Sequence, residues 1–511
     1  MRTTVLSLAA LIFLLQVPCE VAAGEKPNIV VILADDLGYG DVACLNPEGQ
    51  IPTPNLDQLG REGMIFTDAH SSSAVCTPTR YGLLTGRYNW RTRLQSGVLW
   101  GWSPPLIDKD RLTVAGLLRR HGYTTACIGK WHLGMNWSRK NSQKQEDVDY
   151  TAPIADGPTA RGFDYFFGIS ASLDMPPYVY IENDRVTQVP TTQKQWLRRG
   201  PAAEDFEAID VLPRIAEKTV ELIDKHAAGA RRRPPMFIYM PLNSPHTPIV
   251  PTKQWKGKSE INAYADFVMQ TDHAVGQVLD ALDRNGLTDN TLVLFTSDNG
   301  CSPQAKFDQL AKHGHDPSHV FRGHKADIYE GGHRVPFVVR WPGRIEPGSS
   351  SDQTACLTDL MATFAEILGV SLPDDAGEDS VSLLPALRGE ATKPLREATV
   401  HHSINGSFAI RQGRWKLVLC PGSGGWSNPR PGKAPADAPR VQLYDLDDDA
   451  AEQANVQAEH RDVVRRLTAL LQRYVDQGRS NPGAPQSNDA NIKLFKAGRP
   501  SWLDEAVESK Q

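Results

Sequence analysis

The sequence lacks any run of 18 or more apolar residues, and it lacks a surplus of charge of one sign. The first absence argues against a membrane-spanning helix, so we expect a protein that does not enter a membrane. Lys and Arg together number 55 and Asp and Glu number 60, which gives a formal net charge of −5. A nucleic-acid binder needs basic side chains in excess to contact phosphates, so this balance argues against a nucleic-acid partner.

Cysteine is also scarce and scattered. Apart from Cys19, the cysteines occur singly, with no C-x-x-C pair and no spacing typical of zinc ligands: Cys44, Cys76, Cys127, Cys301, Cys356 and Cys420. Small disulfide-stapled proteins use far denser cysteines, so the pattern argues against a disulfide framework and against a zinc site. Most of the six are expected to act as small buried apolar residues.

The first residues have the layout of a secretory signal peptide. Arg2 is followed by an apolar run over 5–17 and by small residues up to Ala23, after which we expect cleavage. Cys19 raises the alternative of a lipid anchor, which the preceding Pro18 fits poorly. A buried N-terminal helix is a further alternative, but nothing caps it before the next strand. We therefore expect a secreted or periplasmic protein.

The rest of the chain has the composition of a globular protein, with 40% hydrophobic and 23% charged residues in 511. Apolar runs rich in β-branched residues predict strands at 28–33, 123–128, 235–240, 291–296 and 336–340. Amphipathic patterns predict helices at 54–61, 114–121, 210–226, 262–285 and 358–368. Strands that alternate with helices indicate an α/β fold, with a large and mainly parallel sheet between helices.

The pattern changes near residue 400. Short alternating runs at 408–410, 415–419 and 441–446 predict a small antiparallel sheet, and 459–476 predicts a helix that closes it. We accordingly expect an α/β domain over 24–398, a smaller α+β subdomain over 399–478, and a loosely ordered tail over 479–511.

Polar residues follow four of the predicted strands directly. Asp35 and Asp36 follow the first strand, and Asp298 and Asn299 follow the strand at 291–296. Ligands of parallel α/β sheets bind beyond the carboxyl ends of the strands, and an all-oxygen set suits Ca²⁺ or Mg²⁺. Each pair taken alone is also a common turn or helix cap. The two remaining strand ends carry Lys130 with His132, and His246.

The segment around Cys76 identifies a family. Cys76, Pro78 and Arg80 form C-x-P-x-R within a longer run over 71–87, which resembles the sulfatase signature. The chain resembles the type I sulfatases of the alkaline-phosphatase-like superfamily from about residue 28 to about residue 455. Further motifs that carry the resemblance, in chain order, are Asp35-Asp36, Gly129-Lys-Trp-His-Leu-Gly134, Ser297-Asp-Asn-Gly300, Gly323-His-Lys-Ala-Asp-Ile-Tyr-Glu-Gly-Gly332 and Leu443-Tyr-Asp-Leu446 with Glu452 and Asn455.

The resemblance implies a nucleophile made from Cys76. In this family a separate maturation enzyme oxidises the cysteine to formylglycine, whose hydrate carries two hydroxyls on one carbon. One hydroxyl attacks sulfur and displaces the alcohol, and the other then loses its proton so that sulfate leaves and the aldehyde returns. The resemblance also makes Asp35, Asp36, Asp298 and Asn299 ligands of one Ca²⁺ ion, completed by an oxygen of residue 76.

The remaining site residues are likewise implied by the resemblance. Arg80 holds the formylglycine and balances the acidic ligands, while Lys130 and Lys325 bind the sulfate group. His246 supports the leaving oxygen as general acid, and His132 is a candidate base for the second step. Ser172 matches a substrate-contacting serine of some relatives, although Ser170 competes for that position.

The function expected is hydrolysis of sulfate monoesters, with a sulfated carbohydrate as substrate. Two alternatives stay open: a phosphomonoester or phosphonate hydrolase of the same superfamily, and a carbohydrate-binding protein without activity if Cys76 is not oxidised. Trp100 and Trp102 form either an apolar rim suited to sugar rings or part of the core. The histidines His313, His315 and His319 either line the pocket or lie on a solvated loop, and Cys301 has no role in this scheme. Loops at 136–160, 173–205 and 301–321 are expected to select the sugar.

Overall fold

A strand of eight buried residues, β1 (Asn28–Asp35), runs through the middle of the large sheet. Its neighbours β10 (Met236–Pro245) and β11 (Thr291–Ser297) are parallel to it. The apolar, β-branched sequence of β1 suits a strand that is covered on both faces. The structure is a computed structural model that describes residues 26–141, 144, 147–229 and 233–503. The predicted signal peptide, residues 1–23, lies outside the described residues.

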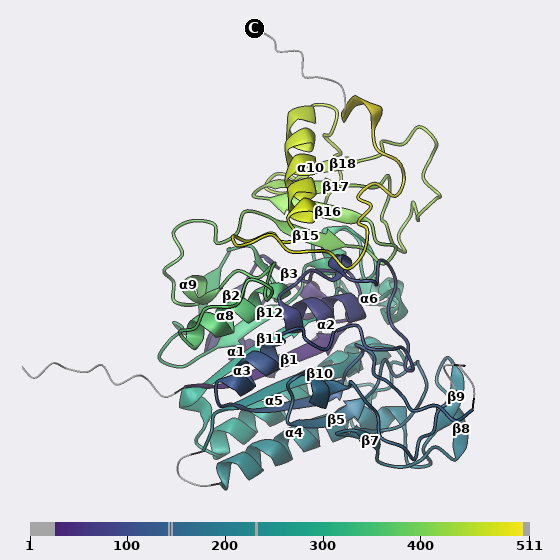
Figure 1. Ribbon diagram of the computed structural model, residues 1–511, viewed down its shortest axis with the longest axis vertical. Helices are drawn as coiled ribbons and strands as arrows, with labels where there is room; N and C mark the ends of the chain where they lie inside the picture. The colour runs from purple at the N-terminus through teal and green to yellow at the C-terminus, as the bar shows by residue number, and fades with distance from the viewer. Residues whose placement is uncertain (1–25, 142–143, 145–146, 230–232, 504–511) are drawn as a thin grey trace, which may run out of the picture.

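Ten strands make up this sheet, in the order β13-β2-β12-β11-β1-β10-β4-β5-β6-β7 (Figure 1). The strands outside the central three are β4 (Thr124–Lys130), β5 (Tyr165–Ile169), β6 (Ile181–Glu182), β7 (Arg185–Val186), β12 (Phe337–Arg340), β2 (Met64–Phe66) and β13 (Ser349–Ser351). The five predicted strands are confirmed as β1, β4, β10, β11 and β12. β12 is antiparallel to β11, so the sheet is mixed, with a parallel centre.

Helices cover both faces of the sheet (Figure 1). One face carries α1 (Pro54–Arg61), α4 (Val211–Ala227) and α5 (Ala263–Arg284), and the other carries α2 (Cys76–Thr85), α3 (Val114–Arg120) and α8 (Leu360–Ile367). Every predicted helix is present, and the structure has one further long helix, α2, that the sequence analysis did not predict. Shorter helices are α6 (Phe307–Lys312), α7 (Glu330–His333) and α9 (Leu384–Leu387). No helix of the described residues combines the length and apolar character that crossing a membrane requires.

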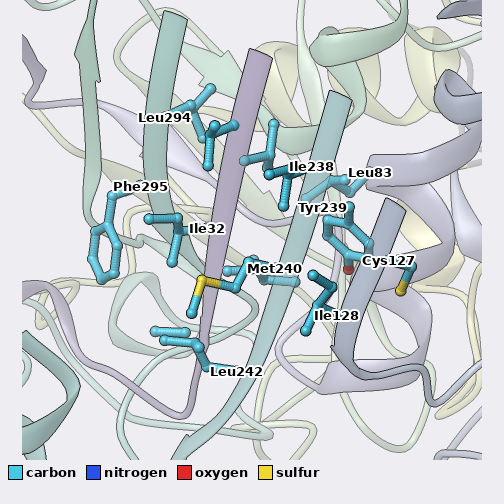
Figure 2. Close-up of a cluster of buried hydrophobic side chains, with 14 of the residues drawn as sticks. Ile32, Leu83, Cys127, Ile128, Ile238, Tyr239, Met240, Leu242, Leu294 and Phe295 are labelled. Atoms are coloured by element: carbon cyan, nitrogen blue, oxygen red, sulfur yellow. The ribbon is translucent and has the colours of Figure 1, made fainter. Parts of the chain in front are cut away.

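The central strands carry buried apolar side chains on both of their faces. Figure 2 shows Ile32 of β1 beside Ile238 and Met240 of β10, with Leu294 of β11 on one side and Leu83 of α2 on the other. Each of these side chains is almost completely buried. Burying an aliphatic side chain of this size contributes about 1.5–3 kcal/mol, so this apolar layer holds the strand ends in place.

The small domain consists of a four-stranded antiparallel sheet and one long helix (Figure 1). Its elements are β15 (Thr399–His402), β16 (Phe408–Gln412), β17 (Trp415–Val418), β18 (Gln442–Asp445) and α10 (Arg461–Asp476). The predicted strands and helix of this region are confirmed, and β15 was not foreseen. Two further pairs of short strands are β3 (Ala69–His70) with β14 (Ala355–Cys356), and β8 (Thr192–Gln195) with β9 (Arg199–Ala202).

The segment over 479–503 packs against the protein instead of forming the loose tail that its polar sequence suggested. Leu494, Phe495 and Leu503 are buried in the same apolar cluster as α10. Asp489, from this segment, pairs with the buried Arg87 at the end of α2, with 2.9 Å between Oδ1 and Nη2. The few apolar residues of the segment are therefore enough to anchor it across both domains.

A buried ion cluster joins the two domains. Lys416 of β17 places its Nζ 3.0 Å from Glu330 Oε1 and 2.8 Å from Glu452 Oε1, and all three side chains are fully buried. Glu452 also accepts a hydrogen bond from the backbone N–H of Glu330 at 2.6 Å. Glu330 is also paired with Arg334 at 3.1 Å, but Lys416 is the one cation of the described residues that is paired with Glu452. Removal of Lys416 therefore leaves the buried Glu452 carboxylate without a counter-ion.

We expect Lys416→Met to lower the free energy of unfolding by about 3–5 kcal/mol, because an unpaired buried carboxylate is costly. Urea denaturation followed by circular dichroism measures the change. Lys433→Met, at an exposed lysine of the same domain, is the matched control and should change stability little. A loss below about 1 kcal/mol for Lys416→Met would contradict the assignment of this cluster as a main contact between the domains.

Candidate functional site

The carboxyl ends of the parallel strands supply the polar centre that the sequence predicts. Asp35 ends β1 and Asp36 follows it, Asp298 and Asn299 follow β11, and Lys130 ends β4. These strands run in parallel with β10 among them, so their ends meet at one edge of the sheet. All five side chains are buried at 0–1% exposure. The chain thus concentrates polar groups at the end of an apolar sheet.

The backbone turns sharply where β1 ends. Asp36 has a φ of 66°, in the left-handed region that Asp adopts more readily than bulkier residues. Its N–H donates to Asp298 Oδ1 at 3.3 Å, and Asn299 Nδ2 donates to Asp36 Oδ1 at 2.8 Å. The turn therefore brings side chains from two neighbouring strands into direct contact.

Cys76 is the first residue of α2, and Arg80 lies one turn further along the same side of the helix. All ten residues of α2 are buried, so the sequence carries no amphipathic period to reveal it. Burial raises the pKa of the Cys76 thiol, although Lys130 and Lys325 lower it. An unmodified Cys76 is therefore a neutral thiol and a weak nucleophile. The N-terminal end of a helix also favours negative charge on the group it faces.

Three cations compensate three buried carboxylates around this helix end. Arg80 Nη2 lies 2.7 Å from Asp298 Oδ2, and Lys130 Nζ lies 2.6 Å from Asp35 Oδ2. The third pair is Lys325 Nζ with Asp36 Oδ1 at 2.6 Å. Burial raises the pKa of Asp35, but Lys130, His246 and Arg80 outweigh it and hold this pKa well below its usual value. Arg80 also donates to the backbone oxygen of Lys130 at 2.9 Å, which ties α2 to β4.

The oxygen atoms of this cluster fit a hard divalent cation. Asp35 Oδ1 and Asn299 Oδ1 are buried and have no hydrogen-bond partner among the described residues. Asp35, Asp36 and His246 have possible ligand atoms that all lie within 4.8 Å of one another. Carboxylate and amide oxygens in this number are the ligands that Ca²⁺ and Mg²⁺ prefer.

Two histidines flank the centre, as the sequence predicts. His132 Nε2 lies 2.8 Å from the carbonyl oxygen of Leu99, so this nitrogen carries the hydrogen and Nδ1 is left as an acceptor without a partner among the described residues. Burial, together with Lys130 and Arg80, places the pKa of His132 well below its usual value. His246 Nε2 lies 3.7 Å from Asp36 Oδ2.

Ser170 and Ser172 both lie on the segment that follows β5, beside His132. The N–H of His132 donates to the backbone oxygen of Ser170 at 3.0 Å. Both hydroxyls are buried and lack a hydrogen-bond partner among the described residues. The choice of Ser172 over Ser170 as a substrate contact therefore stays a prediction.

Several residues without a predicted role form a layer behind Asp36. His315 Nε2 lies 2.9 Å from Asp41 Oδ1, and Tyr264 donates to the other oxygen of Asp41. The Tyr264 hydroxyl also lies 3.3 Å from the backbone oxygen of Asp36. Cys301 is completely buried in the same region. His315 thus supports the turn at Asp36 through Asp41 and Tyr264.

The other two histidines of the 301–321 loop are separate from this layer. His313 is exposed just after α6. The half-buried His319 stacks on Tyr39 with 6.2 Å between ring centroids. The three histidines that the sequence grouped together therefore have three different surroundings.

An α/β sheet that carries acidic residues at its strand ends, with a cysteine at the start of an adjacent helix, defines a hydrolase domain of the alkaline-phosphatase-like superfamily. Comparison with known families is more specific. A family model described as Sulfatase matches residues 27–370, and one described as N-sulphoglucosamine sulphohydrolase, C-terminal, matches residues 321–427. The chain belongs to the sulfatase family and is a sulfuric ester hydrolase.

Individual relatives agree with this assignment. An N-acetylgalactosamine-6-O-sulfatase of Bacteroides thetaiotaomicron is 34% identical over 503 residues, covering 88% of this chain and 93% of that protein. Human arylsulfatase A is 32% identical over 420 residues, covering 79% of this chain and 76% of that protein. A solved structure from Bacteroides thetaiotaomicron, of a protein studied in glycosaminoglycan metabolism, matches with a TM-score of 0.76 and 32% identity. That match covers 88% of this chain and 99% of the other.

Gly129 allows β4 to pack closely on β10 just before Lys130. Its φ is 138°, and a Cβ atom there would lie 1.9 Å from the backbone oxygen of Pro241 in β10. We expect Gly129→Ala to destabilise the protein by at least about 2 kcal/mol more than Gly122→Ala, because crowding adds to the backbone strain. Gly122 also has a positive φ, 87°, but has open space around it. Equal losses of stability in urea denaturation would contradict the crowding at Gly129.

Proposed function

We propose that this protein is an exported, calcium-dependent sulfatase that removes sulfate from a sulfated carbohydrate, with formylglycine made from Cys76 by a maturation enzyme. N-acetylgalactosamine 6-sulfate is the first candidate substrate, because a relative that covers nearly the whole chain is named for that activity. The observation that carries the proposal is the position of Cys76, which begins α2 amid three carboxylates, Asn299 and two lysines. The secretory layout of residues 1–23 supports export.

The chain's own residues supply binding and proton transfer. Lys130 and Lys325 reach the centre from two sides, and their charge suits a sulfate group whose oxygens gain negative charge as the ester bond breaks. His246 donates a proton to the alcohol oxygen that leaves sulfur. His132 has a free Nδ1 and accepts the proton that must leave residue 76 before sulfate is expelled. Arg80 donates to Asp298 and so keeps the start of α2 beside this aspartate.

A calcium ion would be held by Asp35, Asp36, Asp298 and Asn299. When bound, it supplies positive charge that lowers the pKa of a neighbouring hydroxyl and offsets charge on the sulfate oxygens. The buried oxygens Asp35 Oδ1 and Asn299 Oδ1 accept no hydrogen bond from the described residues, so both are available as ligands, and Arg80 Nη2 lies 3.6 Å from Asp35 Oδ1.

The proposed activity predicts a specific preference between esters. Protein purified from a host that makes formylglycine should show, at the peptide carrying Cys76, loss of the elements of H₂S and gain of one oxygen. That protein should hydrolyse 4-nitrophenyl sulfate with a higher kcat/KM than 4-nitrophenyl phosphate, and Cys76→Ala should abolish both reactions. N-acetylgalactosamine 6-sulfate should release inorganic sulfate, measured by ion chromatography.

Two results would count against this proposal. Faster hydrolysis of the phosphate ester would favour a phosphomonoesterase of the same superfamily. An unmodified Cys76 in protein from its natural host would favour a binding protein without catalytic activity.

Calcium should stabilise the protein whether or not residue 76 is oxidised. After chelation and dialysis, we expect Ca²⁺ at about 100 times its Kd to add about 2.7 kcal/mol of stability, seen as a rise in Tm. Asp298→Asn should weaken this effect, because it removes a charged ligand. Asp283→Asn, at an exposed aspartate in α5, is the control and should retain the full rise. An unchanged Tm in the chelated wild-type protein on addition of Ca²⁺ would exclude the calcium site.

A further inference from the structure

Three segments meet beside the nucleophile without any role in the chemistry described so far. The first contains Leu99, whose N–H donates to Thr77 Oγ1 at 3.2 Å, one residue after Cys76. The carbonyl oxygen of Leu99 accepts from His132 Nε2 at 2.8 Å. The segment therefore has one contact with the start of α2 and one with His132, just after β4, and Trp100 is the next residue of this segment.

The other two segments pack on the first through one proline. Pro176 follows β5, and its backbone oxygen would lie 2.0 Å from a Cβ atom on Gly101. A Cβ atom on Gly200, in β9, would lie 2.2 Å from the Cβ of Pro176. Only glycine permits both approaches, so these segments form a closely packed unit.

Trp100 presents an aromatic surface from this unit. It is 47% exposed, one of few large apolar side chains so exposed in the described part of the chain. Trp102, by contrast, is half-buried and donates to the Tyr150 hydroxyl at 3.0 Å, so it belongs to the packed interior. An exposed indole suits the face of a sugar ring.

Arg198 and Asp174 complete the surface around Trp100. The guanidinium carbon of Arg198 lies 4.8 Å from the centre of the Trp100 ring, and Arg198 forms an ion pair with Asp174. Asp174 is 6% exposed, and its Oδ1 atom has no hydrogen-bond partner among the described residues. Tyr178 donates from its hydroxyl to the backbone oxygen of Arg198 and so fixes the arginine at the tip of the β8–β9 hairpin.

The hairpin tip carries backbone strain at the same place. Leu197, between Trp196 and Arg198, has a φ of 136° and is 60% exposed. A branched apolar residue adopts this conformation only when its surroundings require it, and such strain is concentrated at functional sites. Figure 1 shows β8 and β9 at the edge of the molecule, beyond the main sheet.

We propose that Trp100, Arg198 and Asp174 form a binding subsite for a pyranose ring of the sulfated substrate. The inference rests on the proposed function and deepens it by assigning the part of the protein that recognises sugar. The ring lies on the indole, Asp174 Oδ1 accepts a hydrogen bond from a ring hydroxyl, and Arg198 donates to a neighbouring oxygen. Because Asp174 neutralises Arg198, the pair favours a hydroxyl-rich neutral face over a second sulfate or a carboxylate.

The test compares a substrate that contains a sugar with one that lacks it. Trp100→Ala and Asp174→Asn should each lower kcat/KM for N-acetylgalactosamine 6-sulfate about tenfold or more, mainly through KM. Asp174→Asn should leave kcat/KM for 4-nitrophenyl sulfate within about twofold of wild type, since the nitrophenyl group carries no hydroxyl that could donate to Asp174. Trp100→Phe retains a flat aromatic face and should restore part of the activity on the sugar.

A matched control and a binding measurement separate this proposal from the proposed function. Arg214 likewise lies over an aromatic ring, 4.9 Å from the centre of Tyr180, and near Asp205, but it is not part of the proposed subsite. Arg214→Ala should therefore leave kcat/KM unchanged for both esters. In the Cys76→Ala protein, calorimetry with N-acetylgalactosamine 6-sulfate measures affinity without turnover. Adding Trp100→Ala to that protein should weaken the affinity about tenfold.

Several outcomes would overturn the subsite. In Asp174→Asn, an equal loss of kcat/KM on both esters would place Asp174 with the sulfate centre or the fold. No loss on N-acetylgalactosamine 6-sulfate in either variant would leave these residues without a role. Absence of measurable affinity in the Cys76→Ala protein would also overturn it. If the wild-type protein hydrolyses neither ester, the proposed function fails, and the comparison of affinities alone decides the subsite.

Discussion

The structure depends on burying three carboxylates at the end of one sheet without letting them repel each other. Asp35, Asp36 and Asp298 lie in contact with one another's backbone or side chains, where water cannot screen their charges. Lys130, Lys325 and Arg80, brought from elsewhere in the chain, are paired with them, and Asp35 and Asn299 each keep a buried oxygen that accepts no hydrogen bond from the described residues. The arrangement is costly for stability in itself, which is why it requires a large apolar core beneath it.

That constraint explains how the surrounding elements are arranged. The parallel centre of the sheet brings the strand ends together, and the left-handed turn at Asp36 directs its side chain toward β11. α2 places Cys76 and Arg80 over the same point. The small domain contributes to the same end indirectly, because Lys416 anchors Glu330, a few residues after Lys325. The catalytic centre is thus held from the sheet, from a helix and from the second domain.

The residues that we propose for the chemistry and those that we propose for substrate recognition belong to different kinds of structure. Most residues that we propose to handle the sulfate group lie at the ends of buried strands or at the start of a buried helix, so their positions follow from the core, whereas Lys325 lies on a turn before α7. Trp100, Arg198 and Asp174 belong to loops and a hairpin tip, which can vary without disturbing the sheet. This separation is consistent with a family whose members are named for different sulfated substrates, such as N-acetylgalactosamine-6-O-sulfatase and steryl-sulfatase.

The sequence by itself determined the family, the alternation of strands and helices, and the residues that gather at the strand ends. These features are local: β-branched runs such as β1 and the C-x-P-x-R motif can be seen without knowing what they contact. It did not reveal α2, because a helix buried on every side has no amphipathic period, and it did not reveal β15. Nor could the sequence show that Trp100 is exposed and Trp102 half-buried, or that His315 is buried and His313 exposed. The exposure of a side chain depends on what packs against it from distant parts of the chain. Only the tertiary structure decided which cation meets which carboxylate, since those pairs join residues as far apart as Asp36 and Lys325.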